Sequence, residues 1–265
     1  MRIFIIAMDD PLYINKMLIE IIDKRKEDIV GFAYIKNSDR MTIKKNRSKK
    51  LYIISLFLIM GPVYFIKNVF ITMLHKIKIV LSKNISFIKS PLVVDYAVRN
   101  NIESYTLKSP NNGAFIKELI KKEPDIIINQ SMSILKSKLL SIPKIGTLNR
   151  HNALLPKNRG RLTPFWVLYK NEKKTGVSIH FVEEGIDSGD IVIQEEFPVT
   201  KKDTFNSLVK KNYKIAGKAM LKALALIDSG NAKLITNEDK IATYNTTPSI
   251  KQAWKYRNKR LFSLR

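Results

Sequence analysis

Three polar residues of this chain have the types and spacing needed to move an acyl carbon between nitrogens. Asn149 and His151 alternate along an extended segment, so their side chains share a face, and Asp187 follows in the loop Gly185-Ile186-Asp187-Ser188-Gly189-Asp190. Together they supply an amide, an imidazole and a carboxylate. The chain has only 3 histidines, which favours a chemical role for His151. Taken alone, the pair at 149 and 151 also fits a strand end with two satisfied polar groups.

The hydrophobic pattern predicts the elements that would position these residues. Short apolar runs alternate with segments of helical periodicity. This alternation predicts an α/β, Rossmann-like fold with a mostly parallel sheet, helices on both faces, and a site beyond the carboxyl ends of the strands. We expect strands at 2–7, 29–35, 103–107, 125–129, 145–150, 177–182 and 191–197, and helices at 12–25, 91–101, 111–122, 134–140, 163–171 and 203–228.

The sequence also predicts how the chain is divided into domains, and it excludes several kinds of binding site. We assign residues 1–230 to one domain that carries the site, with a helical insertion at 36–90, and residues 231–265 to a basic C-terminal extension. No Gly-x-Gly-x-x-Gly follows the first strand and no Walker loop is present, which argues against dinucleotide or ATP binding in their usual modes. The chain has no cysteine, so disulfides, thiolate metal sites and cysteine nucleophiles are excluded, and we expect no bound metal.

The chain is strongly basic, with a net charge of +24 from 47 Lys and Arg against 23 Asp and Glu. Residues 36–90 hold twelve basic residues and one acid, and residues 248–265 hold six and none. Such a surface would attract phosphate in nucleic acid, anionic lipid or a nucleotide. A composition rich in Lys, Ile and Asn also arises in an AT-biased genome without selection for any partner.

The segment 51–74 allows three interpretations. Leu51 to Ile66 is almost wholly apolar, with Gly61-Pro62 near its middle and lysines on both flanks. It fits two short helices packed on the domain, an interfacial element that contacts an anionic membrane through residues 44–78, or a spanning helix, which Pro62 and Lys67 disfavour. We expect a cytoplasmic protein, and in the second interpretation one that is peripheral at the inner face of the membrane.

The order of the motifs resembles the catalytic domain of the 10-formyltetrahydrofolate-dependent formyltransferases, which act on methionyl-tRNA, phosphoribosylglycinamide or sugar nucleotides. The family hallmark is Asn-x-His followed by Leu-Leu-Pro and a Gly, then an Asp in a Leu/Ile-Asp-x-Gly loop. Here these are Asn149, His151, Leu154-Leu155-Pro156, Gly160 and Ile186-Asp187-Ser188-Gly189, and Lys174–Phe181 matches the family's Thr-Gly-Val strand. The resemblance covers residues 120–200 well and the first 35 loosely, and it departs at Arg150, a position that is usually apolar.

The resemblance implies a formyl donor, 10-formyltetrahydrofolate, and a role for each motif residue. His151 would be the general base or proton shuttle, Asn149 would donate to the developing oxyanion, and Asp187 would hold His151 or a water beside it. The folate would lie against Ser131, Met132, Ile134, Leu135, Val182, Glu183 and Gly185, and the acceptor near Arg150, Leu155, Pro156, Gly160 and Trp166. Core packing also explains Met132, Leu135 and Trp166, solvent exposure also explains Arg150, and we expect a structural role for His180.

The acceptor that the resemblance favours is a primary amine of an amino sugar, as a nucleotide sugar or glycan precursor. The chain is too short for the additional barrel domain with which methionyl-tRNA formyltransferases bind tRNA, although its charge suits tRNA. The alternatives are therefore a methionyl-tRNA formyltransferase-like enzyme, a formyltetrahydrofolate hydrolase that uses water as the acceptor, and a basic, membrane- or RNA-associating protein with a vestigial site.

Overall fold

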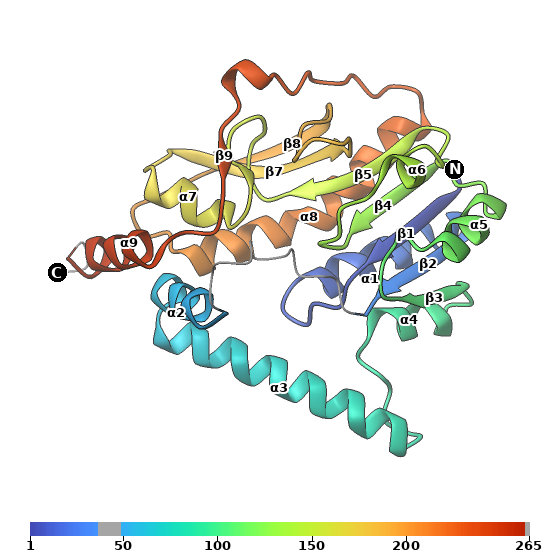
Figure 1. Cartoon of the computed structure of the whole chain (residues 1–265), viewed down its shortest axis with the longest axis horizontal. Helices are drawn as coiled ribbons and strands as arrows, with labels where there is room; N and C mark the ends of the chain where they lie inside the picture. The colour runs from blue at the N-terminus through green and yellow to red at the C-terminus, as the bar shows by residue number, and fades with distance from the viewer. Residues whose placement is uncertain (37–48, 263–265) are drawn as a thin grey trace.

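A seven-stranded sheet in the order β3-β2-β1-β4-β5-β7-β8 forms the centre of the computed structural model, which describes residues 1–36 and 49–262 (Figure 1). Neighbouring strands are parallel from β3 to β5, and β7 and β8 continue the sheet as antiparallel strands. This confirms the predicted Rossmann-like, mostly parallel sheet. The strands are β1 (Ile3–Ala7), β2 (Ile29–Ile35), β3 (Ser104–Leu107), β4 (Ile126–Gln130), β5 (Gly146–His151), β7 (Lys174–Phe181) and β8 (Ile191–Pro198).

Helices cover both faces of the sheet, also as predicted. Side chains of β1 and β4 at alternating positions pack on one face against α1 (Ile14–Arg25), α4 (Val93–Arg99) and α8 (Phe205–Asp228). The other face packs against α5 (Gly113–Lys121) and α6 (Ser137–Leu140). All residues of β1 and β4 are buried, which explains why both strands are continuous apolar runs with no polar alternation until Asn129 and Gln130.

A second cluster of helices lies beside α8. The helix α7 (Thr163–Tyr169) packs through Phe165 and Trp166 against Ile59 of α2 (Lys49–Met60) and Tyr256 of α9 (Ile250–Phe262). A small parallel pair, β6 (Arg159–Gly160) with β9 (Tyr244–Asn245), links the segment after β5 to the C-terminal part of the chain. Short 3-10 turns are η1 (Lys26–Asp28) and η2 (Asp239–Ile241). The sequence pattern did not predict β6, β9 or α9.

The described part of the insertion forms two helices, and only the first of them packs as a core element. Ser55 and Ile59 of α2 are buried, whereas α3 (Pro62–Asn84) has no buried residue. The interpretation of 51–74 as two short helices packed on the domain fits α2. The helix α3 differs, because it is 23 residues long and leaves most of its apolar side chains exposed. The basic flank at Lys44, Lys45 and Arg47 lies outside the described residues.

Within residues 1–36 and 49–262, no single helix has the length and apolar composition needed to span a membrane. One pair of helices, Lys50–Met60 and Pro62–Asn84, is long and apolar enough only when the two are taken together, and they are bent by 119°.

Candidate active site

The Asp187 carboxylate lies between two histidines just beyond the carboxyl end of β5. Its Oδ2 is 3.3 Å from Nδ1 of His151, and its Oδ1 is 3.6 Å from Nε2 of His180. Burial opposes ionisation of this carboxyl, but His151, His180, the Gly160 N–H and Arg159 outweigh burial and lower the pKa of Asp187. The carboxylate is thus held ionised in a mostly buried site, where it can stabilise a positive imidazole ring.

The hydrogen bonds of His151 determine which of its nitrogens can take up a proton. Nε2 lies 2.8 Å from the carbonyl oxygen of Asn158, which can only accept, so the neutral ring carries its proton on Nε2. The other nitrogen, Nδ1, then has a free lone pair beside the Asp187 carboxylate. This arrangement leaves Nδ1 as the nitrogen that can accept a proton in general-base catalysis.

The third histidine, His180, orients the amide of Asn149. Asn149 and His180 are direct cross-strand neighbours in the β5–β7 pairing. Nδ1 of His180 lies 2.7 Å from the Phe181 carbonyl oxygen, so in the neutral ring Nδ1 donates and Nε2, 3.5 Å from Asn149 Nδ2, accepts. Gln130 Nε2 donates to Asn149 Oδ1 at 3.2 Å. With both ends of the amide engaged, one N–H of Asn149 remains to bind an oxyanion.

The protonation state of His180 supports this positioning role. Burial disfavours the charged ring more than Asp187 favours it and lowers the pKa of His180 to about 4. The ring is therefore neutral at physiological pH, as an acceptor for Asn149 must be. Its signal in the sequence was its place in the strand Thr-Gly-Val-Ser-Ile-His, with the spacing that puts Ser178 and His180 on one face.

Two residues outside the sheet hold the Asp187 loop. The N–H of Gly160 donates to Asp187 Oδ2 at 2.8 Å, and Gly160 has a φ of +96° with no room for a Cβ against the Asn245 carbonyl oxygen. Asn237 Nδ2 donates to the backbone oxygens of Asp187 and Gly189 at 2.8 and 2.9 Å. Residues of the C-terminal extension thus take part in the site, and no motif signalled Asn237.

The predicted folate segments lie next to each other. The residues after β4 and those after β7 are joined by a hydrogen bond from the Ser137 hydroxyl to the Glu184 carboxylate. Met132, Ile134 and Ile186 expose apolar side chains here, with Ile134 76% exposed. Of the remaining predicted residues, Leu135 is in the core, Ser131 bonds to Asn129 Oδ1, Val182 N donates to the Thr147 carbonyl oxygen, and Glu183 and Gly185 are exposed.

The predicted acceptor residues fall into different environments. Leu155 is buried, with its N–H on the Ser178 hydroxyl, and Pro156 follows it through a cis peptide bond. Trp166 packs in the α2–α7–α9 cluster and donates through Nε1 to the Thr246 carbonyl oxygen. Gly160 is tied to the His151 site through its hydrogen bond to Asp187.

Arg150 is buried rather than turned to solvent. It leaves β5 on the face opposite to Asn149 and His151, and its guanidinium donates to Gln130, to Asn152 and, at 2.9 Å, to the Tyr213 hydroxyl. The guanidinium also lies 4.3 Å from the centre of the Tyr213 ring. Arg150 therefore fixes Tyr213, which lines a pocket near the carboxyl end of β1.

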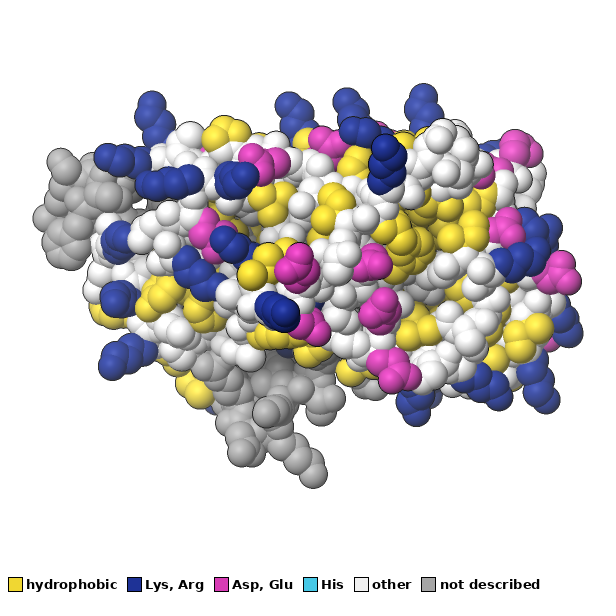
Figure 2. All heavy atoms as spheres, turned by 90° about the horizontal axis from the view of Figure 1, so that it is seen from above, with side chains coloured by type: hydrophobic (Ala, Val, Ile, Leu, Met, Phe, Trp, Pro, Cys, Tyr) yellow, Lys and Arg dark blue, Asp and Glu magenta, His cyan; other side chains and the backbone are white. Residues whose placement is uncertain are grey.

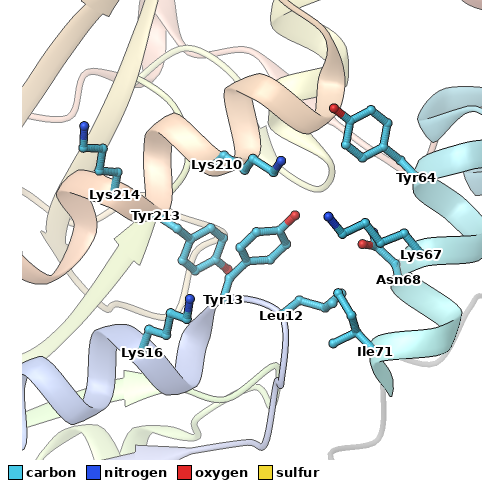
Figure 3. Close-up of a pocket in the computed structure, with 10 residues that line it drawn as sticks. All are labelled: Leu12, Tyr13, Lys16, Tyr64, Lys67, Asn68, Ile71, Lys210, Tyr213 and Lys214. Carbon is cyan, nitrogen blue, oxygen red and sulfur yellow. The ribbon is translucent and has the colours of Figure 1, made fainter. Parts of the chain in front are cut away.

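That pocket has a volume of about 370 Å³ and lies between the start of α1, α3 and α8. Tyr13 and Tyr213 stack along one wall, and Lys67 and Lys210 point toward its centre near the Tyr13 hydroxyl (Figure 3). Four lysines and no acidic residue line it: Lys16, Lys67, Lys210 and Lys214. Because Tyr13 follows the carboxyl end of β1, the pocket opens at the edge of the sheet where ligands bind in such folds.

Comparison with known proteins identifies the family. The family model described as formyl transferase matches residues 78–224, more than half of the chain, and the chain belongs to this family. The methionyl-tRNA formyltransferase of Fusobacterium nucleatum is 31% identical over 153 residues, which are 57% of this chain and 49% of that protein. The chain thus spans about half the length of the curated relatives it matches.

Solved structures share the fold at low sequence identity. The phosphoribosylglycinamide formyltransferase of Bacillus halodurans has a TM-score of 0.59 and 18% identity, covering 86% of this chain and 96% of that one. The N-formyltransferase of Helicobacter canadensis, in complex with folinic acid and dTDP-3-aminofucose, has a TM-score of 0.55 and 19% identity, covering 92% and 71%. These likenesses confirm the fold.

Proposed function

We propose that this protein transfers a formyl group from 10-formyltetrahydrofolate to a primary amine, with Asn149, His151 and Asp187 as its catalytic residues. The observation that carries the proposal is the arrangement around Asp187, which joins His151 and the loop of Gly160 in one buried site. Membership of the formyl transferase family supports the same reaction.

The residues of the site match the steps of such a transfer. The attacking amine forms a bond to the formyl carbon, and the free N–H of Asn149 donates to the oxygen on which negative charge develops. His151 takes a proton from the amine on Nδ1, beside Asp187, and returns a proton to the departing folate nitrogen as its bond to carbon breaks. Formyl group and protons are conserved, and the products are a formamide and tetrahydrofolate.

The donor fits the apolar surface near the Asp187 loop. Exposed Met132, Ile134 and Ile186 offer a hydrophobic contact for a flat heteroaromatic ring. The complex of the Helicobacter canadensis protein with folinic acid supports a reduced folate as the donor.

For the acceptor, we propose a phosphorylated amino sugar such as a nucleotide sugar. The lysine pocket supports this assignment, because four ammonium groups without an acid favour phosphate, and Tyr13 and Tyr213 offer stacked rings to a base or sugar. A second candidate is methionyl-tRNA, which is favoured by the names of the curated relatives. A basic surface suits either acceptor.

A panel of acceptors tests the proposal. The protein is incubated with 10-formyltetrahydrofolate and, separately, a nucleoside-diphosphate amino sugar, glycinamide ribonucleotide, charged initiator tRNA or no acceptor, and formylated product is measured by mass spectrometry. We expect formylation of the amino sugar, and replacing Lys67 and Lys210 by Ala should raise the acceptor KM about tenfold with little change in kcat.

Lys218→Ala is the matched control, because this exposed lysine is on the same helix as Lys210 but outside the pocket. Formylation of tRNA alone would refute the amino sugar. Release of formate without any acceptor would instead identify a hydrolase.

A further inference from the structure

The helix α3 presents an apolar stripe to solvent. Ile66, Phe70, Met73, Ile77 and Leu81 follow one another at intervals of three or four residues, the spacing of one helix face. They are all at least 40% exposed, and Ile66 is 64% exposed. The α2–α3 apolar face comprises Leu51, Ile53, Ile54 and Phe57 of α2 and Val63, Ile66, Val69, Phe70, Met73, Leu74, Ile77, Val80 and Leu81 of α3.

The opposite side of α3 is polar and is attached to the domain. His75 Nε2 lies 2.6 Å from Asp9 Oδ2 in the loop after β1, and the Lys210 ammonium lies 5.2 Å from the centre of the Tyr64 ring. Asn206 of α8 donates to the Met60 carbonyl oxygen, just before α3 begins. These contacts hold the helix with its polar side inward, the reverse of a helix that packs on a globular core.

Large exposed apolar faces of this kind mark interaction surfaces. In Figure 1, α3 lies along an outer edge of the molecule, outside the layer of α1 and α8, so nothing in the described chain covers its outer side. A ligand for this face must therefore be another molecule with an extended apolar surface.

The charge around the face indicates the chemistry of that partner. Residues 50–90 contain six lysines and no Asp or Glu. At about 100° per residue, Lys78 lies on one border of the α3 stripe, and Lys76 and Lys83 lie on the other. Lysines on both borders can bury their methylene groups and reach phosphate, as in helices that lie in the membrane interface.

A second copy of the chain is a poor match for the same face. It would bring lysine borders against lysine borders without a carboxylate between them. The face seen in Figure 2, on the side of the molecule opposite to α3, differs because it carries Asp and Glu among its Lys and Arg side chains. The basic residues Lys251, Lys255 and Arg257 of α9, which packs against α2, add further positive charge near the apolar face.

We propose that the α2–α3 apolar face binds the surface of an anionic membrane, with α3 lying in the plane of the interface. At 1.5 Å per residue, α3 is roughly 35 Å long and can lay its whole stripe along the lipid surface. The lysine pocket is formed by the inner side of α3, so binding would bring it close to the lipid surface.

Vesicle co-sedimentation of the full chain tests the proposal. We expect binding to phosphatidylcholine vesicles with about 30 mol% phosphatidylglycerol, and binding at least about tenfold weaker to phosphatidylcholine alone. The double variant Phe70→Gln with Ile77→Gln should bind the anionic vesicles about tenfold more weakly. Its control, Ile120→Gln with Ile145→Gln, changes two exposed apolar residues away from the α2–α3 apolar face and should bind like the parent.

A charge variant makes the test independent of the apolar substitutions. Lys76→Gln with Lys83→Gln should lower anionic binding about tenfold, whereas Lys201→Gln with Lys218→Gln should change it little. Far-UV circular dichroism checks that each variant is folded. Equal binding by the test and control variants overturns the proposal. So does a dimer in analytical ultracentrifugation that the Phe70→Gln, Ile77→Gln variant dissociates while vesicle binding is absent.

Discussion

Replacing His180 tests whether this residue orients the Asn149 amide or itself transfers the proton. The structure makes it the acceptor that orients the Asn149 amide, with a pKa of about 4. His180→Phe keeps a ring in the buried position and removes the acceptor, whereas His180→Gln can still accept a hydrogen bond from Asn149.

The expected loss follows from what Asn149 retains. Deleting an oxyanion donor outright costs about 100- to 1000-fold in kcat. In His180→Phe the Asn149 amide keeps its contact with Gln130 but is free to turn, so part of that loss applies. We expect kcat to fall about 10- to 100-fold, or about 1.4 to 2.7 kcal/mol, with KM for the folate nearly unchanged. His180→Gln should recover much of the loss.

The assay is formyl transfer as a function of pH, with urea unfolding to confirm that each variant is folded. Because His180 is neutral above pH 5, His180→Phe should lower the kcat plateau without moving its pH dependence in the neutral range. A kcat equal to that of the parent would refute the positioning role. Loss of the neutral limb of the profile would show that His180, not His151, transfers the proton.

Three further predictions concern the Asp187 loop and acid stability. Gly160→Ala should reduce kcat at least about tenfold, because its Cβ would meet the Asn245 carbonyl oxygen at 2.2 Å and displace the N–H from Asp187. The control is Gly230→Ala, which has a φ of +67° and open space around it and should leave kcat unchanged. Equal kcat values for the two variants would contradict this prediction. Asn237→Ala should lower the free energy of unfolding by about 1 to 3 kcal/mol, because the Asp187 and Gly189 carbonyls lose their donor and the Arg159 guanidinium loses one of its acceptors. An unchanged urea midpoint contradicts this. The unfolded state binds a proton at His180 near pH 6.5 and the folded state only near pH 4, so stability should fall by up to about 3 kcal/mol as the pH drops from 6.5 to 4, a loss that His180→Gln should lack in pH-dependent unfolding.

Much of the fold could be predicted from the sequence, because the central strands of the sheet are buried on both faces. β1 and β4 read as continuous apolar runs, and α8 keeps a helical period over 24 residues with a capping box at Thr204. The short pair β6–β9 could not be predicted, because strands of two residues show no periodic hydrophobic pattern. The outward face of α3 was not predictable either, because an apolar helical stripe is the same pattern whether it faces a core or solvent.

Some residues of the candidate site could be predicted from the sequence and others could not. Asn149, His151 and Asp187 stand in motifs with fixed spacing, and the structure brings them together. Asn237 and the pocket lysines depend on long-range packing of loops and helices, which local sequence patterns do not encode. The burial of Arg150 depends on Tyr213, a residue 63 positions away in the chain.

The most direct measurement of the central proposal is the single-turnover rate of formyl transfer by the His151→Ala variant. The amine acceptor is one that the parent protein formylates from 10-formyltetrahydrofolate, and folate binding is measured in parallel by fluorescence. Loss of the proton acceptor beside Asp187 should lower the rate by a factor of about 100 to 10,000 while folate binding and the urea midpoint stay close to those of the parent. A rate equal to that of the parent, in a folded variant that binds folate, would contradict the assignment of His151 as the catalytic base.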